Sequence, residues 1–169
     1  MSTKENLIKV YEYALNQEQT GMSFFKTSRE RLGIGAAVSA FNRLIQEEEK
    51  HILFISHIIE SLKKGKDLDL AQVQEFVMEP TNYFDQRAKS EFLQQCLEGS
   101  MVPDVTVFNT AWLIEKDLSE FYANAARKTE GPEGEAFAML ARWEKAHEQF
   151  FREYRDKLSD IYASMPWGG

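Results

Sequence analysis

The sequence predicts an all-α protein, a bundle of four long helices with one long crossover between the second and the third. Two observations support this prediction. Helix breakers are few and bunched, with four prolines and nine glycines in 169 residues, so long stretches are free to form helices. Within those stretches, apolar residues recur at alternating steps of three and four, the spacing of a helix with one buried face. We expect a single domain over residues 1–169.

The first two predicted helices form a pair separated by a short break. The first covers about residues 3–31, with Ser2 or Thr3 as its N-cap, and the run RLGIG ends it. The second covers about residues 36–63. It ends at the run Lys-Lys-Gly, where Gly65 is a C-cap signal and the lysines suit the negative end of the helix dipole.

A crossover over residues 64–103 joins this pair to a second pair of helices. The crossover contains a short extra helix at about residues 82–97. The third long helix covers about residues 104–129, and the fourth covers about residues 132–163, with Pro132 well placed in its first turn. Two short loops and one long connection are typical of a four-helix bundle with a crossover.

Composition excludes several classes of function. The chain has 20 basic and 27 acidic residues, a net charge of −7 and no basic cluster, which argues against nucleic acid and anionic membranes as partners. It contains no apolar run of about 18 residues that could span a bilayer. The single cysteine, Cys96, excludes an intramolecular disulfide and a cysteine-rich metal site. With no resemblance to a signal peptide at the N-terminus, we expect a cytoplasmic protein.

The two halves of the sequence resemble each other. The run EQTGMSFFKTS starting at Glu18 aligns with EKDLSEFYANA starting at Glu115, a shift of 97 residues. Glu48 and His51 align with Glu144 and His147, a shift of 96 residues. This is an internal repeat of a helix pair.

Each helix has an apolar stripe that is interrupted at one level by ionisable residues. That level holds Glu18, Glu48 and His51, Glu115, and Glu144 and His147, on the first to the fourth helix in turn. Burying four carboxylates together costs several kcal/mol per charge, and the charges also repel one another. Two divalent cations would balance the four carboxylates, and two neutral imidazoles would complete the ligand set. Oxygen and nitrogen ligands without thiolate favour two iron ions, with manganese or zinc as alternatives.

Glu47 is a rival ligand on the second helix, because it lies four residues before His51. Its match in the repeat is Trp143, which cannot bind a metal, so we choose Glu48 and expect Glu47 or Glu49 to face solvent. Tyr122 and Tyr154 lie two turns beyond ligand positions. They are interpreted first as packing residues, with a hydrogen bond to the site or a redox role as the alternative.

One glutamate on each of two helices, with Glu-x-x-His on each of the other two, is the pattern of di-iron carboxylate bundles. The sequence resembles the ferritin-like superfamily, and specifically a rubrerythrin-like diiron domain. The runs E-x-x-G-x-x-F-F at Glu18 and E-x-x-L-x-x-F-Y at Glu115 are similar to a repeated signature of that family. The resemblance implies that Glu18 and His51 bind one metal, that Glu115 and His147 bind the other, and that Glu48 and Glu144 bridge them.

The chain departs from the rubrerythrin pattern in two places. Leu118 stands where rubrerythrins carry a further glutamate, one turn beyond Glu115, and a single cysteine cannot form their rubredoxin-like Cys₄ iron site. The resemblance therefore implies a diferrous centre that reacts with peroxide or O₂ and receives electrons from a separate donor such as a rubredoxin-like protein. We expect a homodimer. The alternatives are iron storage or handling, cargo of a larger shell, oxidation of an organic substrate, and a purely structural metal.

Overall fold

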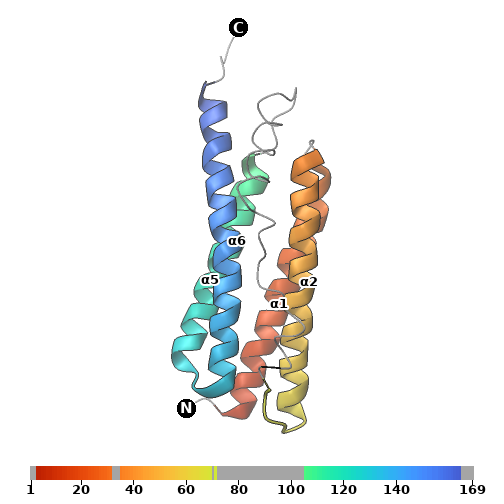
Figure 1. Cartoon of the computed structure of the whole chain (residues 1–169), viewed down its shortest axis with the longest axis vertical. Coiled ribbons are helices and arrows are strands. Elements are labelled where there is room, and N and C mark those ends of the chain that lie inside the picture. Colours follow the sequence, from red (N-terminus) through yellow and green to blue (C-terminus); the bar gives the residue numbers. More distant parts are fainter. Residues whose placement is uncertain (1–2, 32–34, 70, 72–104, 165–169) are drawn as a thin grey trace.

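The computed structural model describes residues 3–31, 35–69, 71 and 105–164, and these residues form helices and turns without any strand. The four long helices run along one another (Figure 1). They are α1 (Lys4–Ser28), α2 (Gly35–Lys63), α5 (Val105–Lys128) and α6 (Gly131–Ser164), and the short 3₁₀ helix η1 (Arg29–Arg31) follows α1. The predicted all-α fold is confirmed, with each long helix within a few residues of its expected bounds. The extra helix expected at about residues 82–97 lies outside the described residues.

The direction of the helices explains why the chain needs a long crossover. α1 packs mainly against α2, and α5 packs mainly against α6. In Figure 1, α2 and α5 run in the same direction, so the chain that leaves α2 must return along the bundle before α5 can begin. A helix of 29 residues such as α2 is about 44 Å long, which sets the distance to be covered.

The ends of the first hairpin are capped as the sequence predicts. Thr3 is the N-cap of α1, and its Oγ1 accepts a hydrogen bond from the backbone N–H of Asn6 at 3.3 Å. At the end of α2, Gly65 has a φ of 70°, the left-handed conformation that glycine adopts without strain. The backbone N–H groups of Lys66 and Gly65 donate to the carbonyls of Ser61 and Leu62, at 3.0 and 3.2 Å. This is a Schellman motif, which satisfies carbonyls that the end of the helix would otherwise leave free.

The turn between α5 and α6 is tight because of two glycines. Gly131 has a φ of 77°, and a side-chain carbon at Gly134 would overlap the backbone carbonyl of Thr129. A side chain at either position would therefore disturb the turn. The turn fixes how far α6 is shifted along α5, and with it the level at which their side chains meet.

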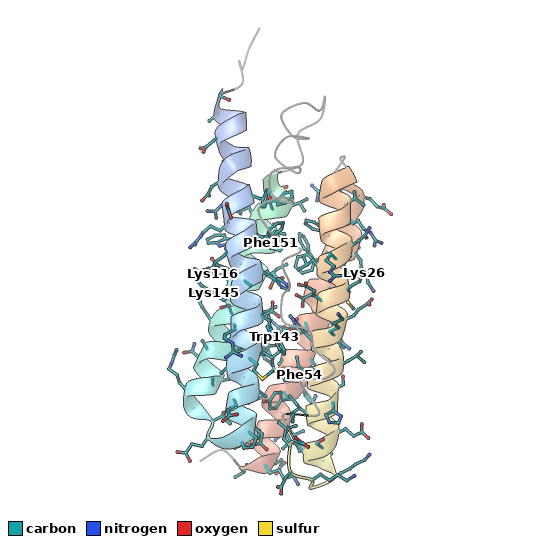
Figure 2. The ribbon with its side chains drawn as sticks, in the orientation of Figure 1. Lys26, Phe54, Lys116, Trp143, Lys145 and Phe151 are labelled. Carbon is teal, nitrogen blue, oxygen red and sulfur yellow. The ribbon has the colours of Figure 1, made fainter. Side chains whose placement is uncertain are left out.

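Two apolar clusters fill the bundle, one on each side of a polar layer. The first includes Tyr11, Phe54, Ile58, Tyr122, Phe137, Leu140 and Trp143, and the second includes Phe25, Phe41, Leu44, Phe108, Phe151 and Tyr154. Figure 2 shows Phe151 of the second cluster displaced along the bundle from Phe54 and Trp143 of the first. Fully burying one such side chain contributes about 1.5–3 kcal/mol, so the two clusters together offset the cost of burying polar groups between them.

Within the described part of the chain, none of the helices combines the length and the apolar composition needed to cross a membrane.

Candidate metal centre

The structure brings the six predicted site residues together in the polar layer. They form two groups that share two members: Glu18, Glu48, His51 and Glu144 in one, and Glu48, Glu115, Glu144 and His147 in the other. In each group, one ligand atom per residue lies within 4.8 Å of those of the others. All six side chains are buried, and His51 is the most exposed at 2%. Their assignment as metal ligands stays a prediction, which this geometry supports.

Helix geometry explains how two residues on one helix reach the same site. Glu48 and His51 are three residues apart on α2, as are Glu144 and His147 on α6, so each pair lies on one face. Glu18 on α1 and Glu115 on α5 complete the layer. Each of the four helices therefore contributes at least one oxygen ligand at a single level of the bundle.

Glu48 and Glu144 are placed to bridge two metals, because each directs one oxygen toward each histidine. Glu144 Oε1 lies 2.9 Å from His51 Nδ1, and Glu144 Oε2 lies 3.6 Å from His147 Nδ1. Glu48 Oε2 lies 3.5 Å from His51 Nδ1, and Glu48 Oε1 lies 3.1 Å from His147 Nδ1. Glu18 approaches only His51, at 3.9 Å, and Glu115 approaches only His147, at 3.7 Å.

Glu18 and Glu115, which each approach only one histidine, favour their protonated form when no metal is bound. Burial raises the pKa of Glu18 well above its usual value, and the charges of Glu144 and Glu48 raise it further. Burial and the same two charges also raise the pKa of Glu115.

The two bridging glutamates and the two histidines favour their charged forms. Burial acts to raise the pKa of Glu48, as does the charge of Glu144, but protonated His51 and hydrogen bonds outweigh them and lower it to about 2. The pKa of Glu144 is also lowered: burial opposes this, but the nearby protonated Glu115 and the charge of His51 outweigh it. Burial acts to lower the pKa of His51, yet Glu48 and Glu144 raise it to about 9. The pKa of His147 is likewise raised, against burial, chiefly by Glu115.

The charge of the layer fits two divalent cations. At neutral pH these pKa directions give two protonated glutamic acids, two carboxylates and two imidazoliums, so the metal-free layer is neutral overall. Two divalent cations that displaced the four removable protons would leave this charge unchanged. Buried oxygens of Glu18, Glu115 and Glu144 also find no hydrogen-bond partner among the described residues. Buried polar atoms without partners are costly, and metal ions would satisfy them.

Tyr122 contacts one of the site residues directly. Its hydroxyl, in the buried core, donates a hydrogen bond to Glu18 Oε1 at 2.7 Å. Burial raises the pKa of the Tyr122 phenol, as do the charges of Glu18 and Glu144, so the phenol stays protonated and remains a donor. The interpretation of Tyr122 as a packing residue alone is therefore wrong, and the hydrogen-bonding alternative is correct. Tyr154 packs against Phe150, with ring centroids 4.6 Å apart.

Glu47 corrects a second expectation, because it does not face solvent. Its side chain is only 8% exposed, and its Oε2 lies 2.6 Å from His147 Nε2 on α6. Glu49, the other residue expected at the surface, is exposed and lies 3.9 Å from Lys26. The helical spacing of Leu44, Glu47, Glu48 and His51 did place Glu47 on the buried stripe, so the sequence contained a signal for its burial.

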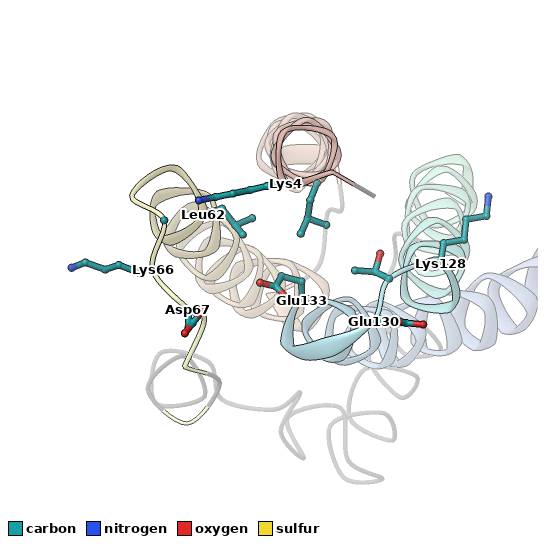
Figure 3. Close-up of a pocket in the computed structure, with 10 residues that line it drawn as sticks. Lys4, Leu62, Lys66, Asp67, Lys128, Glu130 and Glu133 are labelled. Carbon is teal, nitrogen blue, oxygen red and sulfur yellow. The ribbon is translucent and has the colours of Figure 1, made fainter. Parts of the chain in front are cut away.

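A cavity of about 630 Å³ between α1 and α5 lies beside the polar layer. Its lining includes Gly21 and Leu118, each one turn beyond a site glutamate, together with Ile114, Phe24 and Phe121. A second cavity, of about 400 Å³, lies at the end of the bundle between Lys4, Leu62 and Glu133 (Figure 3). Glu133 precedes Glu144 by about 16 Å along α6, so this second cavity belongs to a different part of the molecule.

The fold and the layer together define a class of protein, the ferritin-like bundles that hold a carboxylate-bridged pair of metals. A protein-family model described as rubrerythrin matches residues 9–155 of the chain. The chain therefore belongs to the rubrerythrin family. Separate comparisons of the chain with curated proteins and with solved structures give no match.

Proposed function

We propose that this protein holds two iron ions in the polar layer and that its diferrous centre reacts with peroxide or O₂. The observation that carries the proposal is the pair of ligand groups that share Glu48 and Glu144. Membership of the rubrerythrin family supports the same reading. Manganese or zinc would fit the same oxygen and nitrogen donors, so the choice of iron rests on the redox chemistry proposed.

When bound, the two irons supply the electrons that reduce the oxidant. The chain supplies the environment for this reaction. Glu48 and Glu144 would bind both metals, because each places one oxygen near His51 and the other near His147. Tyr122 holds Glu18 in place and keeps a proton at its hydroxyl, 2.7 Å from that carboxylate. The apolar clusters on both sides exclude bulk water from the layer.

We infer that a small oxidant would approach the layer from the α1–α5 face, where the cavity is lined by Gly21 and Leu118, each one turn from a site glutamate. Leu118 is buried and apolar, so it can neither bind a metal nor relay a proton. We therefore expect appreciable reaction with O₂ and a weaker preference for peroxide than in relatives with a glutamate at this position. Leu118→Glu should shift the preference toward peroxide.

The electrons that return the irons to the ferrous state would come from a separate protein, such as a rubredoxin-like donor. Cys96 is the only cysteine in the 169 residues, so these residues cannot build a Cys₄ iron site themselves. We also propose that the protein acts as a homodimer in the cytoplasm, without a nucleic acid or membrane partner.

The proposal is tested by anaerobic reconstitution with ferrous iron, followed by stopped-flow mixing with O₂ or with hydrogen peroxide. Elemental analysis should give two irons per chain, and both oxidants should oxidise the centre. One iron or none would contradict the site. A centre that is inert to O₂ but fast with peroxide, in both wild type and Leu118→Glu, would contradict the role given to Leu118.

The cavity between α1 and α5 also favours a second candidate, oxidation of a small organic substrate. Its volume of about 630 Å³ lies in the range of small-molecule sites, about 300–1,000 Å³. A substrate oxidase would consume O₂ only when an organic compound is added. Iron storage or shell cargo would instead give a large particle by light scattering and many irons per chain.

A further inference from the structure

The two histidines of the layer are equivalent in the repeat, but the side chains behind them are different. The carboxylate of Glu47 lies at Nε2 of His147, whereas the indole ring of Trp143 is stacked on the face of His51. We propose that Glu47 makes the His147 position the tighter of the two metal positions, so that the metals load in a fixed order. This inference rests on the dimetal centre proposed above.

Glu47 holds the ring of His147 in the orientation that a metal ligand needs. Its Oε2 lies 2.6 Å from Nε2, while Nδ1 on the other side of the ring faces Glu48 and Glu115, at 3.1 and 3.7 Å. A proton held on Nε2 by the carboxylate leaves Nδ1 with its lone pair free for the metal. Such a carboxylate behind a ligating histidine fixes the tautomer and increases the basicity of the ligand.

Trp143 cannot do the same for His51. The two rings are stacked, with centroids 5.2 Å apart and planes 15° from parallel, so the indole covers the face of the imidazole and does not meet its in-plane Nε2 proton. Within the described residues, every carboxylate near His51 approaches it at Nδ1. His51 is therefore positioned by packing and by its contacts at Nδ1 with site glutamates, whereas His147 is also held at Nε2 by Glu47.

The difference between the two histidines comes from one pair of positions that are equivalent in the repeat, Glu47 and Trp143. A shift of 96 residues relates His51 to His147, and the same shift relates Glu47 to Trp143. Glu47 on α2 contacts His147 on α6, and Trp143 on α6 contacts His51 on α2. The carboxylate of Glu47 also adds negative charge beside His147. It therefore attracts a cation at the His147 position more strongly than a cation at the His51 position.

The test is a titration of metal-free protein with Mn²⁺, followed by electron paramagnetic resonance and by calorimetry. The first equivalent should give an isolated Mn²⁺ signal, and the spin-coupled signal of a metal pair should grow only with the second. Glu115→Ala should remove the tight first step, whereas Glu18→Ala should keep it. These two variants identify which position fills first.

Glu47→Gln is the decisive variant, because it keeps the shape of the side chain and removes its charge. We expect it to weaken the first step about 10–100-fold and to bring the two affinities together. Glu47→Asp, which keeps the charge, should recover part of the loss. Glu49→Gln is the matched control, since Glu49 lies on the same helix with its side chain exposed beside Lys26, and it should leave both steps unchanged.

Several outcomes would overturn the inference. A coupled signal from the first equivalent, an unchanged first step in Glu47→Gln, or equal weakening of both steps would each show that Glu47 does not order the loading. Wild-type protein that binds no metal would instead contradict the proposed function itself. A melting curve of metal-free Glu47→Gln close to that of the wild type confirms that the variant is folded.

Discussion

The α1–α2 hairpin and the α5–α6 hairpin contribute the same three candidate ligands, two glutamates and a histidine, at the same level of the bundle. They differ in the residues around those side chains. Gly21 on α1 corresponds to Leu118 on α5, and Phe25 corresponds to Tyr122. As a result the Glu18 side of the layer receives a hydrogen bond from Tyr122. The ring of Phe25, which has no hydroxyl, packs instead against Phe151, with centroids 5.9 Å apart.

This comparison separates two kinds of constraint on the layer. Glu48 and Glu144 each belong to both ligand groups, so a change of either residue would disturb the whole proposed centre. A residue behind a ligand acts on one position only, so the two hairpins are free to differ there. The expected result is a symmetric set of ligands in an asymmetric environment.

The largest effect is expected from the bridging glutamates. Glu48→Ala and Glu144→Ala should each lower the metal affinity of both positions by more than about 100-fold, because each removes a ligand. Removing a residue that only hydrogen-bonds to a ligand costs about 10–100-fold. Glu18→Ala and Glu115→Ala should each weaken one position and leave the other occupied. Elemental analysis after dialysis against a weak chelator distinguishes the two patterns. A bridging variant that keeps one full metal position would show that the two hairpins do not share these ligands.

An intermediate effect is expected on the stability of the metal-free protein. The pKa of His51 is raised to about 9 in the folded protein from an ordinary value of 6.5, so its contribution to stability is fully present below pH 6.5. That contribution, on the order of 3 kcal/mol, is lost as the pH rises toward 9. The raised pKa values of Glu18, Glu115 and His147 act in the same direction.

Metal-free protein should therefore melt at a lower temperature at pH 8 than at pH 6.5. Loaded protein should change less, because metals replace the protons of all four groups. The difference between the melting temperatures of loaded and metal-free protein should increase as the pH rises. Calorimetry of both forms at the two pH values measures it, and a gap that narrows would contradict the protonation pattern derived for the layer.

A smaller effect is expected from Tyr122→Phe, which makes the two hairpins more alike. Removing the hydroxyl leaves Glu18 Oε1 without its donor and should cost the metal-free protein about 1–3 kcal/mol of stability. Affinity should fall about 10-fold at the Glu18 position and stay unchanged at the other. Tyr13→Phe is the control, since Tyr13 lies on the surface with 52% of its area exposed. Equal losses at both positions would contradict a local role for Tyr122.

The fold was predictable because its signals are local. The periodic apolar stripes give the helices, and Thr3 and Gly65 mark two of their ends through capping groups that depend on only a few neighbouring residues. The end of α1 was harder to place, because the last predicted residues, Arg29–Arg31, form a 3₁₀ turn rather than an α-helix. In this turn the Arg29 side chain donates a hydrogen bond to Asn42 of α2 at 2.8 Å, a contact that the local sequence does not indicate.

The meeting of the six residues in one layer was predictable because two signals agree: the helical spacing and the repeat. The residues that contact these six side chains from outside the layer were not predictable, because the two halves of the repeat differ at those positions. The match of Glu47 to Trp143 led us to predict that Glu47 is not a ligand and that it faces solvent, and the second expectation was wrong. Only the packing of α2 against α6 shows that a carboxylate opposite a histidine can be buried as its hydrogen-bond partner. Tyr122 reaches Glu18 across the bundle for the same reason.

The most direct test of the account is a crystal structure of the iron-loaded protein with anomalous diffraction data collected at the iron absorption edge. The account predicts two anomalous peaks per chain. One should lie beside Glu18 and His51 and the other beside Glu115 and His147, with Glu48 and Glu144 bound to both. A single peak, or peaks away from this layer, would contradict the claim that the six residues form one dimetal centre.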